Sequence, residues 1–182
     1  MSYFITYALV SSNTNDVKRS VFQLMEPYDN EYEVEEYETE CMCDCGRDEF
    51  DPDCEQCAGT GVYRTTWNPM SNFDSYYIWD GEHVLRNASK NPSDWEDEPA
   101  IDDNIPDDYD EEEAMAALSD LNIERLELPD VIVTPSGEWH EMPGYWYFDD
   151  RESAEWQEWR ETVKKILTQW PDAILVVLLC HS

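Results

Sequence analysis

The chain has 182 residues, which is enough for one hydrophobic core with a small satellite module. Apolar residues make up 41% of it and aromatic residues 13%, and this composition excludes a wholly disordered protein. The 43 Asp and Glu outnumber the 11 Lys and Arg, and the formal net charge of −32 argues against direct binding of nucleic acid. Because acidic surfaces attract basic ones, we expect a partner with a basic, nucleic-acid-binding groove.

The six Cys residues indicate metal ligands or free thiols, because the sequence shows no secretory signal. Residues 1–7 lack the basic start and the apolar core of such a signal, so we expect a cytoplasmic protein. The longest apolar run, residues 173–180, has eight residues, whereas a membrane-spanning helix needs about 20.

The first part of the chain is expected to contain a strand, a helix and a second strand. β-branched and aromatic residues predict a strand over residues 2–10, and Asn15 or Asp16 is the expected N-cap of the helix that follows. Residues 31–40 alternate Glu with apolar residues, but the doubled Glu35-Glu36 shifts the phase by one position. We therefore expect a strand with a bulge at this point and with one face formed by Glu side chains.

In the middle of the chain, short strands are predicted over residues 62–66 and 76–79, on either side of the turn-rich residues 68–72. Residues 92–113 contain twelve acidic residues and no Lys or Arg, so we expect an exposed acidic loop there. Apolar residues at helical spacing then predict a short helix over residues 111–121.

The last fifty residues hold the clearest pattern. Residues 131–134 and 139–142 read as a hairpin, and Asp149 with Glu152 resembles a capping box at the start of a helix. The apolar stripe of this helix consists of Trp156, Trp159, Val163, Ile166, Leu167 and Trp170, and Pro171 ends it. Residues 173–180 are apolar throughout, which is typical of a central strand covered on both faces.

This order of elements predicts an α+β fold with a helix-backed, mainly antiparallel sheet, and a ferredoxin-like arrangement is the first interpretation. We expect one domain over residues 1–182, with a small zinc-knuckle insertion at residues 41–61.

Five of the six Cys residues form two groups within this insertion. Cys54 and Cys57 have the spacing with which one tight turn aims two thiolates at a zinc ion, and Gly59 leaves room for backbone amides near sulfur. The other two ligands would come from the first group, and the alternative is a set of unligated or oxidised thiols. Four Cys ligands leave no open coordination position, so the zinc would be structural. The expected ligands are Cys43, Cys45, Cys54 and Cys57, with Cys41 as the substitute.

Residues 54–61, Cys-Glu-Gln-Cys-Ala-Gly-Thr-Gly, resemble one copy of the repeated zinc-binding element of DnaJ-type chaperones. The resemblance supports zinc binding. It implies no chaperone activity, because those chaperones use several copies and a separate helical domain.

Residues 63–78 resemble a motif of small uncharacterised bacteriophage proteins, an Asn-Pro-x-Ser-x-(Trp/Phe)-Asp-x-Tyr run followed by a Gly-Gly-Arg-Trp turn. Residues 133–141 and 176–181 resemble later motifs of the same family. In this chain Trp-Asp-Gly-Glu at residues 79–82 replaces the turn and removes its Arg. The resemblance implies a bacteriophage origin, and therefore the cytoplasm of a host cell.

Three histidines, His83, His140 and His181, are the candidates for acid–base chemistry near neutral pH. A nucleophile pair of Cys180 and His181 is disfavoured, because adjacent residues of a strand point to opposite faces. Structural roles are the simpler interpretation, so no enzymatic activity is expected, and an enzyme using His140 or His181 is the remote alternative.

Charge and resemblance together favour a non-enzymatic phage protein that binds and inhibits a host nucleic-acid-binding or defence protein, such as a CRISPR or restriction complex. It would act by mimicry, since alternate Glu side chains of a strand lie about 6–7 Å apart, close to the spacing of successive phosphates. The alternative is a zinc-stabilised acidic adaptor in a phage complex. The residues expected to bind the partner are Glu31, Glu33, Glu35, Asp107, Asp108 and Asp110.

Overall fold

The structure of the protein is a computed structural model that describes residues 3–41, 53–78, 114–143 and 153–182. The chain divides into two compact units. Unit 1 comprises Met1–Glu26 and Phe73–Ser182, and unit 2 comprises Pro27–Asn72. Unit 2 therefore extends beyond the insertion expected at residues 41–61 on both sides, whereas the acidic loop expected at residues 92–113 lies outside the described residues.

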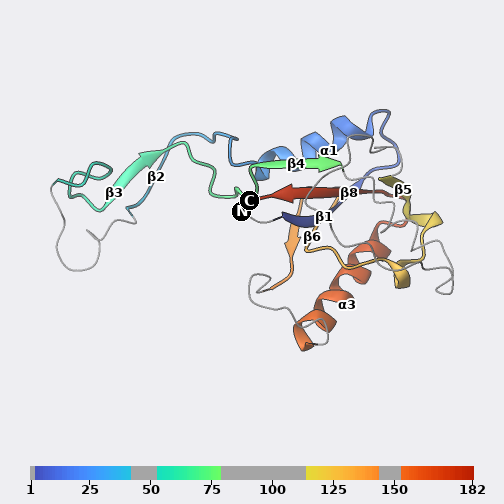
Figure 1. Cartoon of the computed structure of the whole chain (residues 1–182). Coiled ribbons are helices and arrows are strands. Elements are labelled where there is room, and N and C mark those ends of the chain that lie inside the picture. Colours follow the sequence, from blue (N-terminus) through green and yellow to red (C-terminus); the bar gives the residue numbers. More distant parts are fainter. Residues whose placement is uncertain (1–2, 42–52, 79–113, 144–152) are drawn as a thin grey trace. The chain divides into compact units, whose positions relative to one another are not determined.

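Unit 1 contains a six-stranded sheet in the order β4-β8-β1-β6-β7, with β5 also paired to β8 (Figure 1). Among the described strands only β1 and β6 pair in parallel, and the other four pairings of this sheet are antiparallel. The expected α+β class with a mainly antiparallel sheet is thereby confirmed. The strands are β1 (Tyr3–Val10), β4 (Ser75–Ile78), β5 (Met115–Ala117), β6 (Val131–Val133), β7 (Trp139–Glu141) and β8 (Ile174–His181).

The ferredoxin-like arrangement is not confirmed. Its split βαβ units place another strand between two parallel strands, whereas β1 pairs directly with β6, from Thr6 opposite Val131 to Ala8 opposite Val133. The apolar pattern of each strand could not predict this pairing, because the pattern indicates which face of the strand is buried and not which other strand pairs with it.

Two helices cover opposite faces of this sheet (Figure 1). Helix α3 (Ala154–Gln169) packs on the face that carries Tyr7 and Leu175. Helix α1 (Val17–Met25) contacts β1 and buries Val21. The central strand β8 is buried along most of its length, as its continuous apolar run predicts.

Side-chain caps begin both helices. Asp16, one of the two predicted caps, accepts a first-turn backbone N–H at 3.0 Å. The predicted start of α3 at Asp149 is wrong, because the N-cap is Ser153, whose Oγ accepts a first-turn N–H at 3.3 Å. Asp149 and Glu152 themselves lie outside the described residues. The predicted stripe is confirmed: Trp159, Val163, Ile166 and Leu167 are buried, and Trp156 and Trp170 pack against the same core.

The helix predicted over residues 111–121 is wrong for its described part, residues 114–121. Met115–Ala117 forms β5, with Met115 opposite Val176 of β8, and Leu118–Asp120 forms a single 3-10 turn, η4. The edge of β8 offers unpaired backbone groups, and pairing with them outweighs the helix propensity of a short Ala-rich segment. A second 3-10 turn, η5 (Ile123–Arg125), follows.

Unit 2 is built around a two-stranded antiparallel ladder of β2 (Tyr37–Glu40) and β3 (Val62–Thr65). The strand predicted over residues 31–40 is therefore shorter than expected, because Glu31 instead donates its N–H to Asp29 Oδ1 in a turn. One hydrogen bond lies beyond the ladder, from Val34 N–H to Thr66 O at 3.0 Å. The doubled Glu35-Glu36 thus interrupts the regular pairing at the position where the bulge was expected.

The base of unit 2 is held by a buried asparagine. Asn68 donates its side-chain amide to the carbonyl oxygens of Pro27 and Asp29, at 2.8 and 3.1 Å, and accepts the Met70 N–H at 3.0 Å. The Asn72 N–H donates to Tyr28 O at 2.8 Å. Because every one of these groups is paired, the buried amide ties both ends of the unit together without an unsatisfied polar group. The 3-10 turn η1 (Glu26–Tyr28) leads into this base.

Candidate metal centre

Three cysteines of unit 2 lie within contact distance of one another. Cys41 directly follows β2, and Cys54 and Cys57 lie in the loop before β3. Their sulfur atoms all lie within 4.8 Å of one another, and the Cys41 and Cys54 Sγ atoms are 3.8 Å apart. A disulfide needs about 2.05 Å between its sulfur atoms, and none of the three residues forms one. The three cysteines could therefore bind a metal ion.

The spacing of the sulfur atoms fits a tetrahedral thiolate site. With a Zn–S bond of about 2.3 Å, two sulfur ligands of a tetrahedral zinc ion lie about 3.8 Å apart. The Cys41–Cys54 separation is 3.8 Å. A soft metal ion that prefers thiolates would thus find these two side chains already at ligand distance.

The loop that carries Cys54 and Cys57 is a tight turn made possible by two glycines. Gly59 and Gly61 have φ values of +77° and +78°, in the left-handed region that glycine adopts without strain. The Ala58 N–H closes the turn on Cys54 O at 2.8 Å. The Cys41 N–H donates to Gly61 O at 2.8 Å, which joins the first cysteine to the loop that carries the other two.

The electrostatics of this loop favour a thiolate at Cys57. Burial acts to raise the pKa of its thiol, but hydrogen bonds from the Gly61 backbone, Cys54, the Gly59 backbone and Cys41 together hold that pKa below its ordinary value. Backbone N–H groups that converge on a sulfur atom stabilise its charged form. Gly59 therefore serves the sulfur as the sequence predicted, by letting its amide approach, and Gly61 contributes a second amide.

The predicted ligand set is only partly within the described residues. Cys54 and Cys57 lie together as expected, and Cys41, the predicted substitute, joins them. Cys43 and Cys45 lie outside the described residues. The two strands that flank the cysteines could have indicated Cys41, because pairing residues 37–40 with 62–65 brings the residue after β2 opposite the loop before β3.

The acidic residues expected to bind a partner lie on the surface where they are described. Glu31, Glu33 and Glu35 are exposed. They lie before β2 and not in a strand, so the regular spacing expected of them is wrong. Strand spacing applies instead to Glu38 and Glu40, which are exposed on one face of β2. Asp107, Asp108 and Asp110 lie outside the described residues.

The histidine candidates occupy unit 1. His140 Nε2 lies 3.9 Å from a Glu138 carboxylate oxygen, and His181 Nδ1 lies 2.6 Å from Asp74 Oδ1. The hydrogen bond from His181 is the main cause that lowers the pKa of Asp74. Asp74 is 107 residues from His181 in the sequence, and no local pattern could have indicated this pair. His83 lies outside the described residues.

Cys180 does not form a nucleophile pair with His181. Its Sγ is buried and donates to Thr6 Oγ1 at 3.4 Å, and burial raises the pKa of its thiol to about 12. The neighbouring His181 points to the other face of β8, toward Tyr3 and Asp74. The thiol therefore stays protonated at neutral pH.

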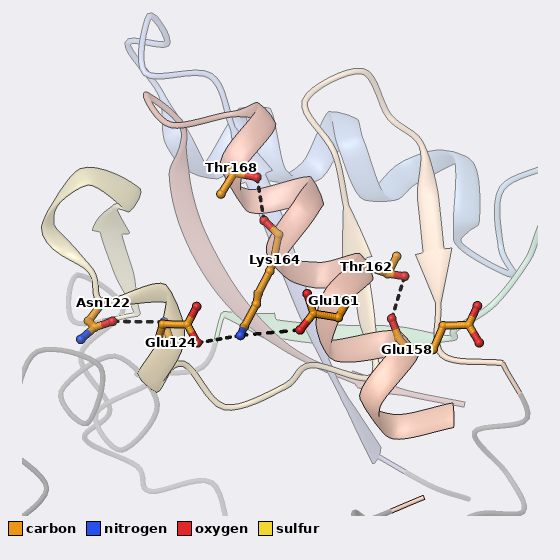
Figure 2. A network of polar contacts seen from close by, with 7 residues as sticks. All are labelled: Asn122, Glu124, Glu158, Glu161, Thr162, Lys164 and Thr168. Carbon is orange, nitrogen blue, oxygen red and sulfur yellow. Dashed lines mark hydrogen bonds and ion pairs between the residues drawn. The ribbon is translucent and has the colours of Figure 1, made fainter. Parts of the chain in front are cut away.

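A hollow beside α3 is the other feature that could suggest a site. Its volume of about 10 Å³ gives room for about one water molecule. Lys164 lies at its edge and reaches Glu124 of η5 at 2.6 Å and Glu161 at 3.9 Å (Figure 2). These contacts fasten η5 to the helix.

None of the helices in the described parts of the chain is long and apolar enough to cross a membrane. No protein-family model matches the chain. No curated protein and no solved structure shows a significant similarity to it. The candidate metal centre and the acidic surface of unit 2 are therefore the basis for a functional proposal.

Proposed function

We propose that this chain is a non-enzymatic acidic protein that occupies the basic groove of a nucleic-acid-binding protein in place of nucleic acid. The observation that carries the proposal is the uncompensated charge of unit 2. Residues 27–72 contain thirteen Asp and Glu against two Arg. Arg64 is the cation among the described residues of this unit, and it pairs with Glu36 at 3.0 Å.

Several of the other carboxylates that the structure describes in this unit are exposed and lie close together in the sequence. Glu38 and Glu40 project from the same face of β2, about 6–7 Å apart by strand geometry. Glu31, Glu33 and Glu35 continue the acidic surface before the strand. A basic groove built to neutralise phosphates gains the same counter-charge from such a surface, so binding should weaken steeply with salt.

We further propose that the metal of the cysteine cluster is a structural zinc ion. All described donors are Cys sulfur atoms, which bind zinc as thiolates, and a fourth ligand from Cys43 or Cys45 would close the coordination sphere. When bound, zinc would hold the loop before β3 to the end of β2. It would leave the carboxylates of β2 on the outer surface.

The bacteriophage resemblance suggests which partner to test first: a host defence protein that handles nucleic acid, such as a CRISPR or restriction complex. The full chain would be immobilised to capture its partner from a bacterial lysate. The purified partner would then be loaded with a labelled nucleic acid and titrated with the chain. The proposal predicts displacement of the label and a steep fall in affinity between low and moderate salt.

A matched pair of variants tests where the charge acts. The first variant should displace less of the labelled nucleic acid from the partner, and it combines Glu31→Gln, Glu33→Gln and Glu35→Gln. A separate variant neutralises the acidic stretch that includes Asp107, Asp108 and Asp110. The control replaces three exposed acids of unit 1, Glu138, Glu158 and Glu161, by Gln. Equal effects of the two triple variants, or a complex that holds the chain and the nucleic acid together, would contradict mimicry.

The second candidate is an acidic adaptor, and the division into two compact units favours it, because each unit could engage a different protein. An adaptor predicts a ternary complex in which nucleic acid remains bound. The titration described above separates the two functions by whether the label is released.

A further inference from the structure

We infer that Cys41 is a metal ligand and that the bound metal controls the acidic surface of unit 2 while leaving unit 1 unchanged. The partner-binding consequence rests on the proposed function. The ligand assignment and the independence of the two units do not.

The position of Cys41 supports a ligand role. It is buried, and its Sγ lies 3.8 Å from Cys54 Sγ and within 4.8 Å of Cys57 Sγ. The backbone contributes as well, since the Cys41 N–H donates to Gly61 O at 2.8 Å. Backbone and side chain thus fix the thiol on the same side as the other two. A metal ion bound by Cys54 and Cys57 would thus have a third sulfur ligand close at hand.

A metal ion at this point would cross-link the ladder. Cys41 follows Glu40, the last residue of β2, and the loop with Cys54 and Cys57 ends at Val62, the first residue of β3. One ion bound to all three sulfur atoms therefore closes the end of the hairpin. Its loss would free the same two strand ends from each other.

Among the described residues, the cysteine end of the ladder has a small buried cluster. This cluster consists of Cys41 and Cys57, with Cys54 and Tyr63 packed against it. A two-stranded ladder by itself is marginal in water, and small modules commonly add a metal or a disulfide. The repulsion among the neighbouring carboxylates adds to this instability.

Unit 1, by contrast, carries its own core of strands and α3. We therefore expect removal of the metal to unfold the ladder of unit 2 and to leave the sheet of unit 1 intact. The carboxylates of β2 would lose their fixed spacing, and ordering them again on the partner would cost binding free energy.

The test uses the full chain and zinc itself. Parent, Cys41→Ser and a control, Cys180→Ser, would be compared for zinc content by elemental analysis and for zinc affinity by chelator competition. The control removes a buried thiol of unit 1, and serine can keep its hydrogen bond to Thr6. Cys41→Ser should lower zinc affinity by about tenfold or more, whereas Cys180→Ser should not change it.

Amide hydrogen exchange on the same samples reports on each unit separately. In Cys41→Ser and in chelator-treated parent, residues 37–40 and 62–65 should exchange rapidly while β1 and β8 stay protected. Protection of β1 and β8 shows that the variant is folded. Cys41→His, which keeps a zinc ligand at this position, should restore part of the zinc affinity.

Two results would overturn the inference: zinc affinity of Cys41→Ser equal to that of Cys180→Ser, or unchanged protection of residues 37–40 after zinc removal. The partner is then titrated with zinc-loaded and zinc-free chain. If the zinc-loaded and the zinc-free chain bind the partner equally, the metal does not control the acidic surface, and the proposed function stands. If the zinc-loaded parent displaces no nucleic acid, the proposed function is wrong, and the zinc and exchange measurements still decide the ligand role of Cys41.

Discussion

The two units of this chain are held together by different means. Unit 1 buries large side chains such as Tyr7, Trp159 and Leu175 between its sheet and α3. Unit 2 has a cluster of cysteines at one end, a buried Asn68 at the other and a short ladder between them. A sheet that buries this much apolar surface stabilises itself, whereas a small acidic module needs a cross-link. The comparison therefore predicts that each unit can be disrupted without the other.

The largest effect is expected from removing two proposed ligands of the candidate metal centre. Cys54→Ser with Cys57→Ser should abolish metal binding, which in small zinc modules supplies an apparent free energy of about 10–16 kcal/mol at neutral pH. Calorimetry of the parent should show one unfolding transition that a chelator shifts and one that it does not. In the double variant only the chelator-independent transition should remain. Loss of both transitions would show that the units fold together.

The second substitution weakens the core of unit 1 and should leave unit 2 unaffected. Leu175→Ala removes a fully buried side chain of the central strand and should lower the free energy of unfolding by about 2–5 kcal/mol. Urea denaturation followed by far-UV circular dichroism would measure it. Zinc content should stay at the parent level. A variant that released its zinc at denaturant concentrations where the parent is folded would argue against independent units.

A smaller effect is expected at the Asp74–His181 pair, which links β8 to the residue before β4. The hydrogen bond from His181 lowers the pKa of Asp74 in the folded state. This contribution is therefore present above the unfolded pKa of about 3.9 and is lost as the pH falls through the folded pKa. Asp74→Asn should lower the melting temperature of unit 1 at pH 6, and the difference from the parent should shrink below pH 4. A difference that stayed constant down to pH 2 would exclude this linkage.

The smallest effect is expected at the surface of α3. Lys164→Met removes the ion pair with Glu124, whose side chain is 70% exposed, so the loss should stay below about 1 kcal/mol and vanish at high salt. Methionine keeps an unbranched apolar side chain at this position while removing the charge. Lys165→Met on the exposed face of the same helix is the control. A difference between the two variants that persists in molar salt would mean that packing and not charge connects η5 to α3.

Much of the secondary structure could be predicted, because short-range patterns determine it. The alternation or continuity of apolar residues located β1 and β8, and Asp16 was a recognisable cap for α1. The segment around Met115 was mispredicted because its pairing partner, Val176, lies far along the chain. A short apolar segment can join either a helix or a sheet edge, and only the neighbouring strand selects between them.

In the candidate site, too, contacts between neighbours in the sequence could be predicted, whereas contacts between distant segments could not. The spacing of Cys54 and Cys57, with Gly59 after them, was enough to predict that the two thiols lie together on a tight turn, because those contacts span only a few residues. The place of Cys41 depended on the pairing of β2 with β3, and the Asp74–His181 contact depended on the return of the chain to the end of the sheet.

The sequence by itself determined the charge of this protein, the alternation of its strands, the stripe of α3 and the turn at Cys54, since each depends on neighbours in the chain. Only the tertiary structure decided that β1 lies between β8 and β6, that β5 is a strand and that Cys41 joins the other two cysteines. Those outcomes depend on which distant segments meet, and many strands of similar pattern could satisfy the same local preferences. The choice among them depends on how completely the joined segments bury apolar surface and pair their backbone groups.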